Sequence, residues 1–456
     1  LEVVARAGRS YGLHSGPDGE AVQNPEEVVG AALAALAELA EGLGGRTVQA
    51  IVPSAAMHSL IPLDRAGAPL APALTWADTR PASVLPELRA LLDPGALYAR
   101  TGCPLQAPYH PARLLWLCRT QPEVFYRAER FVSLTDLLLF HLTGRWATSV
   151  GLASTSGLWT LDGGWDEGGL AALCVRPEQL PPVFDAREVI GPVLAGELAG
   201  TPVLAGSSDG ALANLGSGAG GGVVVTVGTS GALRRLAPAP RLDPGARSWS
   251  YRLDSSTFLN GGAINNGGLL LEWARRQWYP ELDSAQGFRQ LLDDAGQTPA
   301  GADGLTMLPY LTGERSPLWR SDLTASLHGL RLHHGRPQLA RAALEAIAFS
   351  LAAVWDAVRE TDTPDREILA SGGLAASPAW TRLLAGVLEL PIRPLDAADA
   401  SASGAALLGF GEEAVRRLEE RVGALPAMPP DPSQLGALRE ARARWTSVQR
   451  QLYGES

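Results

Sequence analysis

The sequence predicts a layered α/β protein, because strand-like and helix-like segments alternate along the chain. A helical apolar run at residues 25–43 lies between strand-like segments at 3–13 and 48–53. A short apolar run at 201–205 then leads into a helix-like segment, and two strand-like runs surround a turn at 228–230. A chain of 456 residues, at about 150 residues per domain, is long enough for two or three domains with ample core.

The first predicted helix has a complete start signal. Asn24 can cap it, Pro25 occupies its first position, and Glu27 falls at its third position. The apolar run continues to Leu43 and stops at a pair of glycines, which are common at helix ends.

Five more elements are expected in the second half. Residues 223–235 predict two strands around a tight turn. Residues 339–360 predict a long helix, because apolar side chains recur on one stripe. Residues 368–371 predict a strand, and Ser377-Pro378 starts the helix that follows it.

Charge and composition exclude several classes of function. The chain has 38 basic residues, all of them arginine, against 48 acidic ones, for a net charge of −10. Without lysine there is no P-loop lysine, no pyridoxal-phosphate Schiff base and no lysine nucleophile. The acidic balance argues against nucleic acid as a partner. The longest weakly charged run, 201–233, is rich in Gly and Ser and includes Asp209, so no membrane span is expected.

The cysteines predict a reducing compartment. Cys103, Cys118 and Cys174 are few, odd in number and without CxxC spacing, and no N-terminal segment of the sequence has the pattern of a signal peptide. We therefore expect a cytoplasmic protein.

Asp209 is the first candidate for chemistry. It follows the apolar run at 201–205 and opens the helix-like segment of GSSDGALANLG. An aspartate there can simply cap a helix. It can also project into a cleft at a strand end and accept a proton from a substrate hydroxyl.

Two glycine-containing turns are candidates for nucleotide binding. Gly228-Thr229-Ser230 is either an ordinary hairpin turn or a phosphate cradle of N–H groups and hydroxyls. The bare backbone of Gly372-Gly373 either makes a tight turn or lets a flat ligand such as a nucleoside approach closely.

Two polar segments could line a sugar site. His58 and Ser59 follow one short strand-like run, and Trp76, Asp78 and Arg80 follow another. His58 and Trp76 could be ordinary core residues. An apolar wall beside groups that form bidentate hydrogen bonds also suits a polyol, and Arg80 could pair with an acidic group of the substrate.

Two longer segments resemble the signatures of the FGGY carbohydrate kinases. ASLHGL at 325–330, followed after seven residues by QLARAALE at 338–345, resembles the second signature. HPARLLWLCRTQPE at 110–123 resembles the first, with Arg113 where the family usually has Lys. The resemblance runs from Val3 to about residue 413.

Within that family, SAAMHSLIPLD, ALTWADTR and RTGCPLQAPYHP resemble gluconate kinases. Xylulose kinases more often show Gln-Met-His-Gly at 56–59, and TGERSPLW at 312–319 is shared more widely. The resemblance implies an actin-like ATPase fold of two ribonuclease-H-like domains around a central cleft. The expected domains are 1–216 for the sugar and 217–456 for the nucleotide, with a last helix free to pack back on the first domain.

The resemblance also implies roles for individual residues, with ATP and Mg²⁺ as cofactors, no assigned metal ligands and a possible homodimer. The expected roles are the catalytic base for Asp209; phosphate binding for Gly228, Thr229 and Ser230; further nucleotide contacts for Gly268, Gly372, Gly373 and Ser377; and the sugar site for His58, Ser59, Trp76, Asp78 and Arg80.

The start of the chain departs from the family pattern. The family begins with an Asp-x-Gly-Thr hairpin that contacts phosphate, and no such motif precedes Val3. Either the sequence is truncated or the motif was lost. The expected function is phosphorylation of D-gluconate to 6-phosphogluconate. The alternatives are a kinase for xylulose or another polyol, and a sugar or nucleotide binder without turnover.

Overall fold

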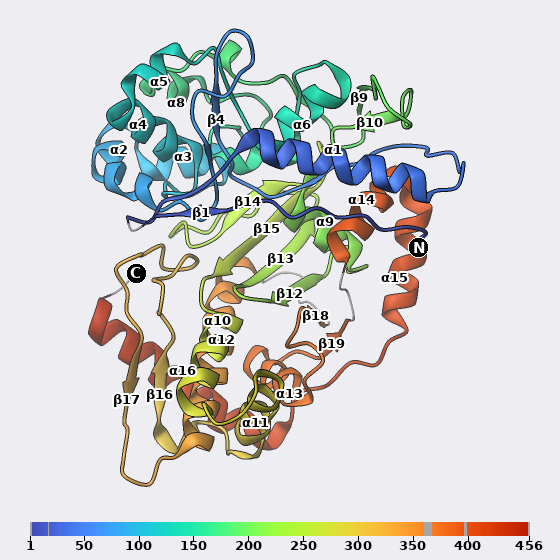
Figure 1. Ribbon diagram of the computed structural model, residues 1–456. Coiled ribbons are helices and arrows are strands. Elements are labelled where there is room, and N and C mark those ends of the chain that lie inside the picture. The colour runs from blue at the N-terminus through green and yellow to red at the C-terminus, as the bar shows by residue number, and fades with distance from the viewer. Residues whose placement is uncertain (1, 17, 360–366, 396–398, 455–456) are drawn as a thin grey trace.

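The computed structural model describes residues 2–16, 18–359, 367–395 and 399–454. Figure 1 shows two halves, the N-terminal one above in blue to teal and the C-terminal one below in green to red. Both halves combine helices with strands. None of the described helices is both long enough and apolar enough to cross a membrane.

The first half contains several small sheets of two or three short strands. β3 runs parallel to β11, and β7 to β8, while the other pairs are antiparallel. Its elements are β1 (His14–Ser15), β2 (Ala21–Gln23), α1 (Pro25–Gly42), β3 (Ser54–Ala55), β4 (Ile61–Leu63), β5 (Ala73–Leu74), η1 (Arg80–Val84), α2 (Leu85–Leu91), α3 (Pro94–Thr101), α4 (His110–Thr120), α5 (Pro122–Arg127), β6 (Arg130–Val132), α6 (Leu134–Thr143), β7 (Thr148–Ser149), α7 (Val150–Ala153), η2 (Ser154–Ser156), α8 (Glu167–Ala172), η3 (Pro177–Gln179), β8 (Val183–Phe184), β9 (Val189–Pro192), β10 (Pro202–Leu204), β11 (Ser207–Ser208) and α9 (Asp209–Gly216).

The second half is built on a six-stranded sheet of order β14-β15-β13-β12-β18-β19. The first four strands are antiparallel neighbours, and β12, β18 and β19 run parallel. Its elements are β12 (Val223–Val227), β13 (Gly231–Ala237), β14 (Trp249–Arg252), β15 (Phe258–Ile264), α10 (Gly268–Trp278), α11 (Ser284–Gln297), η4 (Ala302–Gly304), β16 (Thr306–Leu308), β17 (Ser326–His328), α12 (Arg336–Val358), β18 (Ile368–Ser371), α13 (Pro378–Leu388), β19 (Ile392–Pro394), α14 (Ala400–Phe410), α15 (Glu412–Gly423) and α16 (Pro432–Tyr453).

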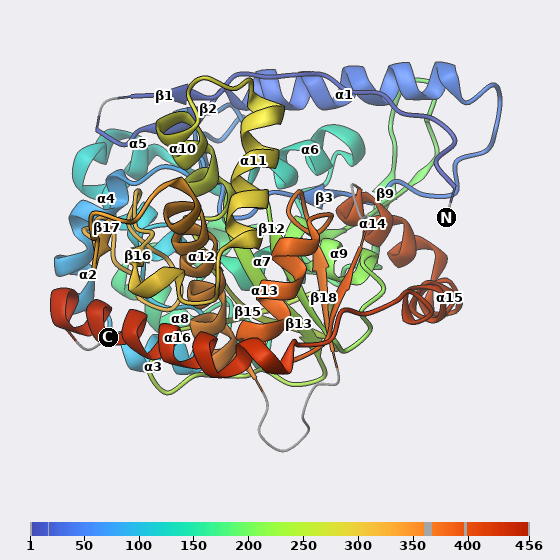
Figure 2. The same cartoon turned by 90° about the horizontal axis from the view of Figure 1, so that it is seen from below.

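Helices cover both faces of this sheet. Val223, Val225 and Val227 point into a core that contains α10 and α12. Leu236 points to the other face, into a core shared with α9 and α14. This alternation follows from the two-residue period of a strand. In Figure 2, α12 and α9 accordingly lie on opposite sides of the strands.

The last helices leave the sheet in two directions. α14 packs on α9, so the C-terminal part of the chain returns to the junction between the halves. α16 packs instead on α13, β16 and α12, and it runs along the lower edge of the second half in Figure 2.

The predicted helix boundaries are confirmed closely. The Asn24 side chain caps α1 by accepting from the N–H groups of Glu26 and Glu27, at 3.0 and 3.4 Å. The Glu27 carboxylate accepts a hydrogen bond from Gly12 N at 2.9 Å, which ties the preceding segment to this helix. The helix expected at 339–360 is α12, which begins three residues earlier; residue 360 lies outside the described residues.

Two strand predictions were wrong. Residues 2–13 form no strand, because no described strand pairs with them and most of their side chains face solvent. In the segment 48–53, only Ile51 makes an isolated bridge, to Val203, and the strand itself starts at Ser54. A run of strand-forming residues becomes a strand only where a neighbour supplies the backbone hydrogen bonds.

Candidate active site

Parallel pairing of β3 with β11 creates the first part of the site. Ser54 lies opposite Ser207, and Ala55 lies opposite Ser208. Because parallel strands end at the same edge, the residues that follow them meet there. Asp209 follows β11 directly and begins α9, whereas His58 follows β3 by three residues. Positions about 150 residues apart therefore share one edge.

Asp209 does not cap α9 in the usual way. The capping position belongs to Ser208, whose side chain makes no capping hydrogen bond. Asp209 Oδ1 accepts from Gly210 N at 2.6 Å, and no other hydrogen bond to this carboxylate is made within the described ranges. Asp209 as a residue is exposed to solvent, although surrounding protein atoms desolvate its carboxyl group. Burial raises its pKa, while nearby Arg234 and the Gly210 N–H lower it.

His58 is held as a neutral imidazole. Burial, assisted by the charges of Arg113 and His110, lowers its pKa to about 3. Its Nδ1 lies 3.0 Å from the carbonyl oxygen of Thr155, so Nδ1 carries the proton and donates it. Nε2 is then a hydrogen-bond acceptor, which suits a sugar hydroxyl.

Two tyrosines enclose the His58 ring. The ring centroids of Tyr109 and Tyr251 lie 5.2 and 6.3 Å from it, both edge to face. Neighbouring Ser59 is buried, and its hydroxyl accepts from Leu134 N at 3.0 Å. Ser59 thus fixes the start of α6 against the loop that carries His58.

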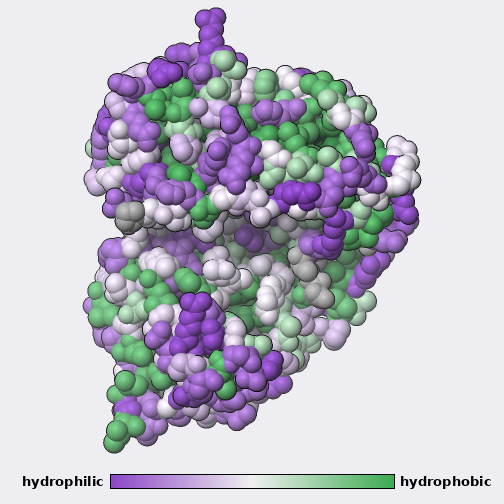
Figure 3. All heavy atoms as spheres, viewed as in Figure 1, coloured by the Kyte–Doolittle hydropathy of each residue, from purple (hydrophilic) through white to green (hydrophobic). Residues whose placement is uncertain are grey.

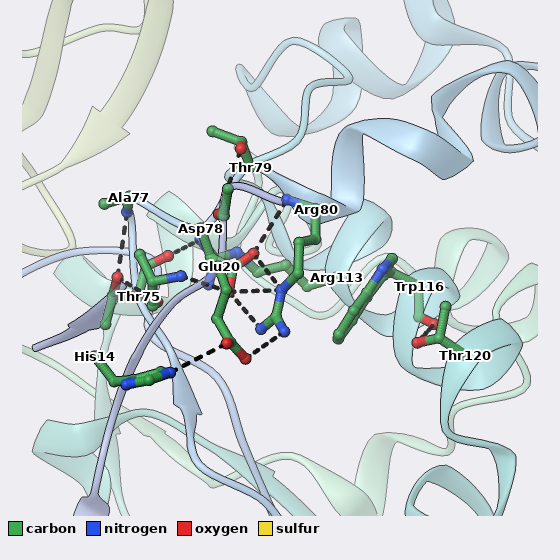
Figure 4. Close-up of polar contacts among 12 residues, drawn as sticks. His14, Glu20, Thr75, Ala77, Asp78, Thr79, Arg80, Arg113, Trp116 and Thr120 are labelled. Atoms are coloured by element: carbon green, nitrogen blue, oxygen red, sulfur yellow. Dashed lines mark hydrogen bonds and ion pairs between the residues drawn. The ribbon is translucent and has the colours of Figure 1, made fainter. Parts of the chain in front are cut away.

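The Arg80 guanidinium is neutralised by two carboxylates. Figure 4 shows it between Asp78 and Glu20, with the ring of Trp116 beside it. Its Nη2 lies 2.6 Å from Asp78 Oδ2, its Nη1 lies 2.5 Å from Glu20 Oε1, and its central carbon lies 4.6 Å from the Trp116 ring centroid. Asp78 is only 1% exposed and also accepts from Ala21 N. These ion pairs remove the physical reason for expecting Arg80 to bind a substrate acid.

Trp76 is exposed enough to form an apolar wall that faces a ligand. It is 59% exposed, between the buried Thr75 and the half-buried Ala77. Arg113, which stands where the family usually has lysine, donates to the carbonyl oxygens of Thr75 and Pro108. Arg113 therefore supports the backbone on which Trp76 stands.

The turn at 228–230 joins β12 to β13 and is backed by α10. Gly268 N donates to Gly228 O at 2.7 Å, and Leu269 N donates to Thr229 O at 2.9 Å. A Cβ at Gly268 would lie 2.6 Å from Gly228 O, so only glycine allows this approach. The outer side of Gly228 is open, with no atom within 4 Å of a Cβ built there. That open side has room for a phosphate.

The end of β18 lies beside the same turn. Thr226 and Ser371, on the neighbouring strands β12 and β18, share a hydrogen bond of 2.8 Å between their hydroxyls. Gly372 has φ +89°, and a Cβ on it would lie 2.4 Å from Val227 O. Gly373 is exposed and open, whereas the Ser377 side chain caps α13 by accepting from Trp380 N.

Several polar residues of this region were not singled out from the sequence. Tyr109 and Tyr251 join their hydroxyls across the two halves, and Arg234, Glu314 and Arg315 lie near them. Tyr109 and Arg315 belong to motifs already quoted, APYHP and TGERSPLW. The motifs were visible, but nothing in the residue spacing shows that they converge.

Family descriptions match nearly the whole chain. The N-terminal domain of the FGGY family of carbohydrate kinases matches residues 1–216, and the C-terminal domain matches residues 223–411. The chain belongs to this family. It is a carbohydrate kinase with the actin-like two-domain fold, so the fold and enzyme class predicted from the signatures are confirmed.

Named relatives include kinases for two kinds of sugar. A gluconokinase from Bacillus subtilis is 31% identical over 90% of this chain and 83% of its own length. A gluconate kinase structure from Lactobacillus acidophilus has a TM-score of 0.90 and 28% identity, covering 97% of this chain and 92% of that one. A ligand-bound xylulose kinase structure from the same organism matches with the same values.

The residues present fit a nucleotide that carries Mg²⁺. The described residues contain no cluster of three or more His, Cys, Asp or Glu arranged for a metal. Mg²⁺ at kinase sites is usually held by one or two carboxylates together with phosphates and water. Asp209, with one oxygen free of hydrogen bonds from the described residues, is suited to that partial role.

Proposed function

We propose that this kinase transfers the γ-phosphoryl group of ATP to the primary hydroxyl of D-gluconate, giving 6-phosphogluconate. The observation that supports this most directly is the parallel pairing of β3 with β11, because His58 and Asp209 follow these two strands. Asp209 offers an ionisable oxygen, and His58 offers a neutral acceptor nitrogen. Figure 3 shows the molecule hollowed between its halves, which gives a substrate access to its interior.

In the proposed reaction, Asp209 accepts the proton of the substrate hydroxyl as that oxygen attacks the γ-phosphorus. His58 and Trp76 position the sugar, by a hydrogen bond to Nε2 and by an apolar wall. The turn at 228–230 presents backbone and hydroxyl groups to the phosphates. When bound with ATP, Mg²⁺ would offset the phosphate charges. Positioning and electrostatics supply most of the rate in phosphoryl transfer.

The direct test is ADP release by the full chain with Mg-ATP and D-gluconate, with D-xylulose and no sugar as controls. Release that depends on gluconate supports the proposal. Release with xylulose but not gluconate would replace it by the second candidate, a xylulose kinase, which is favoured by the equal structural similarity to a xylulose kinase. A cytoplasmic location and a homodimer stay predictions.

A further inference from the structure

Two arginine side chains lie near the candidate site residues: Arg234 lies within electrostatic reach of Asp209, and Arg315 within electrostatic reach of His58. Arg234 stands on the α9-facing side of β13, and a Cβ built on Gly210 would lie 3.3 Å from its Nε. Arg315 approaches from the loop after β16, where its Nε donates to Asn265 Oδ1 at 2.7 Å and its Nη2 to Ile264 O at 3.1 Å. Both guanidinium groups lie within electrostatic reach of each other and of Tyr251.

The charge of Arg234 is poorly compensated. Its Nε is buried without a hydrogen-bond partner, and within the described part of the chain it forms no ion pair. Asp209 is the carboxylate that acts on it electrostatically, and burial works against ionisation of that carboxylate. Arg234 is half-buried, and a buried donor without a partner costs free energy, so this position favours an incoming anion.

Arg315 adds to the imbalance. Its hydrogen bonds go to neutral oxygens, and the adjoining carboxylate belongs to Glu314. Burial raises the pKa of Glu314 to about 7, so its negative charge is incomplete near neutral pH. Arg80, by contrast, has two carboxylate partners at 2.5 and 2.6 Å. Positive charge available for a ligand therefore lies at Arg234 and Arg315.

We propose that Arg234, with Arg315 beside it, binds the carboxylate of the sugar acid and makes the enzyme selective for aldonates over neutral polyols. This inference rests on the proposed function and assigns the acid-recognising residue within it. Arginine suits this task because its planar fork matches a carboxylate with two parallel hydrogen bonds.

The test compares D-gluconate with D-gluconamide, which has the same carbon chain and hydroxyl groups but a neutral end. Calorimetric binding is measured on the full chain, with and without ADP, for the unchanged protein and for Arg234→Gln and Arg234→Lys. Arg235→Gln is the matched control, because the neighbouring residue on a strand faces the opposite side of the sheet. Unfolding midpoints establish that each variant is folded.

The unchanged protein is expected to bind gluconate about 10- to 100-fold more tightly than gluconamide, the usual range for a charge-assisted pair. Arg234→Gln is expected to abolish this preference, because it weakens the binding of gluconate and leaves the binding of gluconamide unchanged. Arg234→Lys should keep part of it, and Arg235→Gln should keep all of it.

Three outcomes would overturn the inference. If the unchanged protein binds gluconate and gluconamide equally, the proposed function stands but the carboxylate is not recognised. If Arg234→Gln preserves the ratio of gluconate to gluconamide affinity and weakens nucleotide binding instead, the guanidinium binds the phosphates. If neither ligand binds while D-xylulose does, the gluconate proposal itself fails, and this inference fails with it.

Discussion

The hydroxyl oxygens of Tyr109 and Tyr251 lie 2.6 Å apart, and their hydrogen bond joins the two halves of the kinase. Tyr109 immediately precedes α4, whereas Tyr251 stands on the outer strand of the six-stranded sheet. Both rings are buried and flank His58. The contact thus couples the relative position of the halves to the residue expected to bind the sugar.

Replacing either tyrosine by phenylalanine should lower the free energy of unfolding by about 1–3 kcal/mol, because the other hydroxyl is left buried without its partner. The double variant should be less destabilised than the sum of the two single changes. Urea unfolding of the four proteins checks this. Strict additivity would show that the bond contributes nothing.

Asp209→Asn should lower kcat about 10²-fold or more, since an amide cannot accept the proton of the attacking hydroxyl. Gluconate binding by calorimetry should stay within about threefold, because among the described residues Gly210 N is the sole donor to this carboxylate. Near-normal ADP release by the variant would reject Asp209 as the base.

Gly372→Ala should destabilise the second half by about 2 kcal/mol or more. Gly372 has φ +89°, and a Cβ added there would lie only 2.4 Å from Val227 O. Gly373→Ala is the matched control, because nothing lies within 4 Å of its Cβ. Thermal unfolding should separate the two. If Gly373 also faces adenosine, its alanine variant should weaken ADP binding without a change in stability.

Arg80→Gln should destabilise the first half by about 3–5 kcal/mol, because it leaves the buried carboxylate of Asp78 without its partner. Arg119→Gln breaks an exposed pair with Glu87 and should leave stability nearly unchanged, because water screens exposed ion pairs. The ratio of gluconate to gluconamide affinity should be unchanged in Arg80→Gln. A loss of that ratio would instead assign recognition of the substrate carboxylate to Arg80.

Glu314 should make stability fall as pH rises. Its folded pKa of about 7 lies above its ordinary value of 4.5. Between these values the folded state keeps a proton that the unfolded state releases, so stability is lost as pH rises from about 4.5 to 7. Glu314→Gln should flatten this part of the profile. Urea unfolding at several pH values measures it, and an unchanged slope would contradict the assignment.

The sequence by itself determined much of this protein. Helix boundaries followed from local capping, as at Asn24 and Ser377, because a cap depends on residues only a few positions apart. The hairpin around 228–230 and the family signatures were equally local, and they predicted the fold and the enzyme class that the family match confirms. These predictions needed no knowledge of distant contacts.

Only the tertiary structure decided which side chains are free to bind. The sequence predicts Asp78 and Arg80 as part of a sugar site, and folding pairs Arg80 with Glu20 and Asp78 with the N–H of Ala21. Arg234 looked ordinary in the sequence, yet folding buries its Nε beside Asp209 without a partner. The sequence specifies which residues carry a charge. Whether that charge is already compensated depends on groups that meet through long-range packing, and that balance decides whether it can hold a substrate.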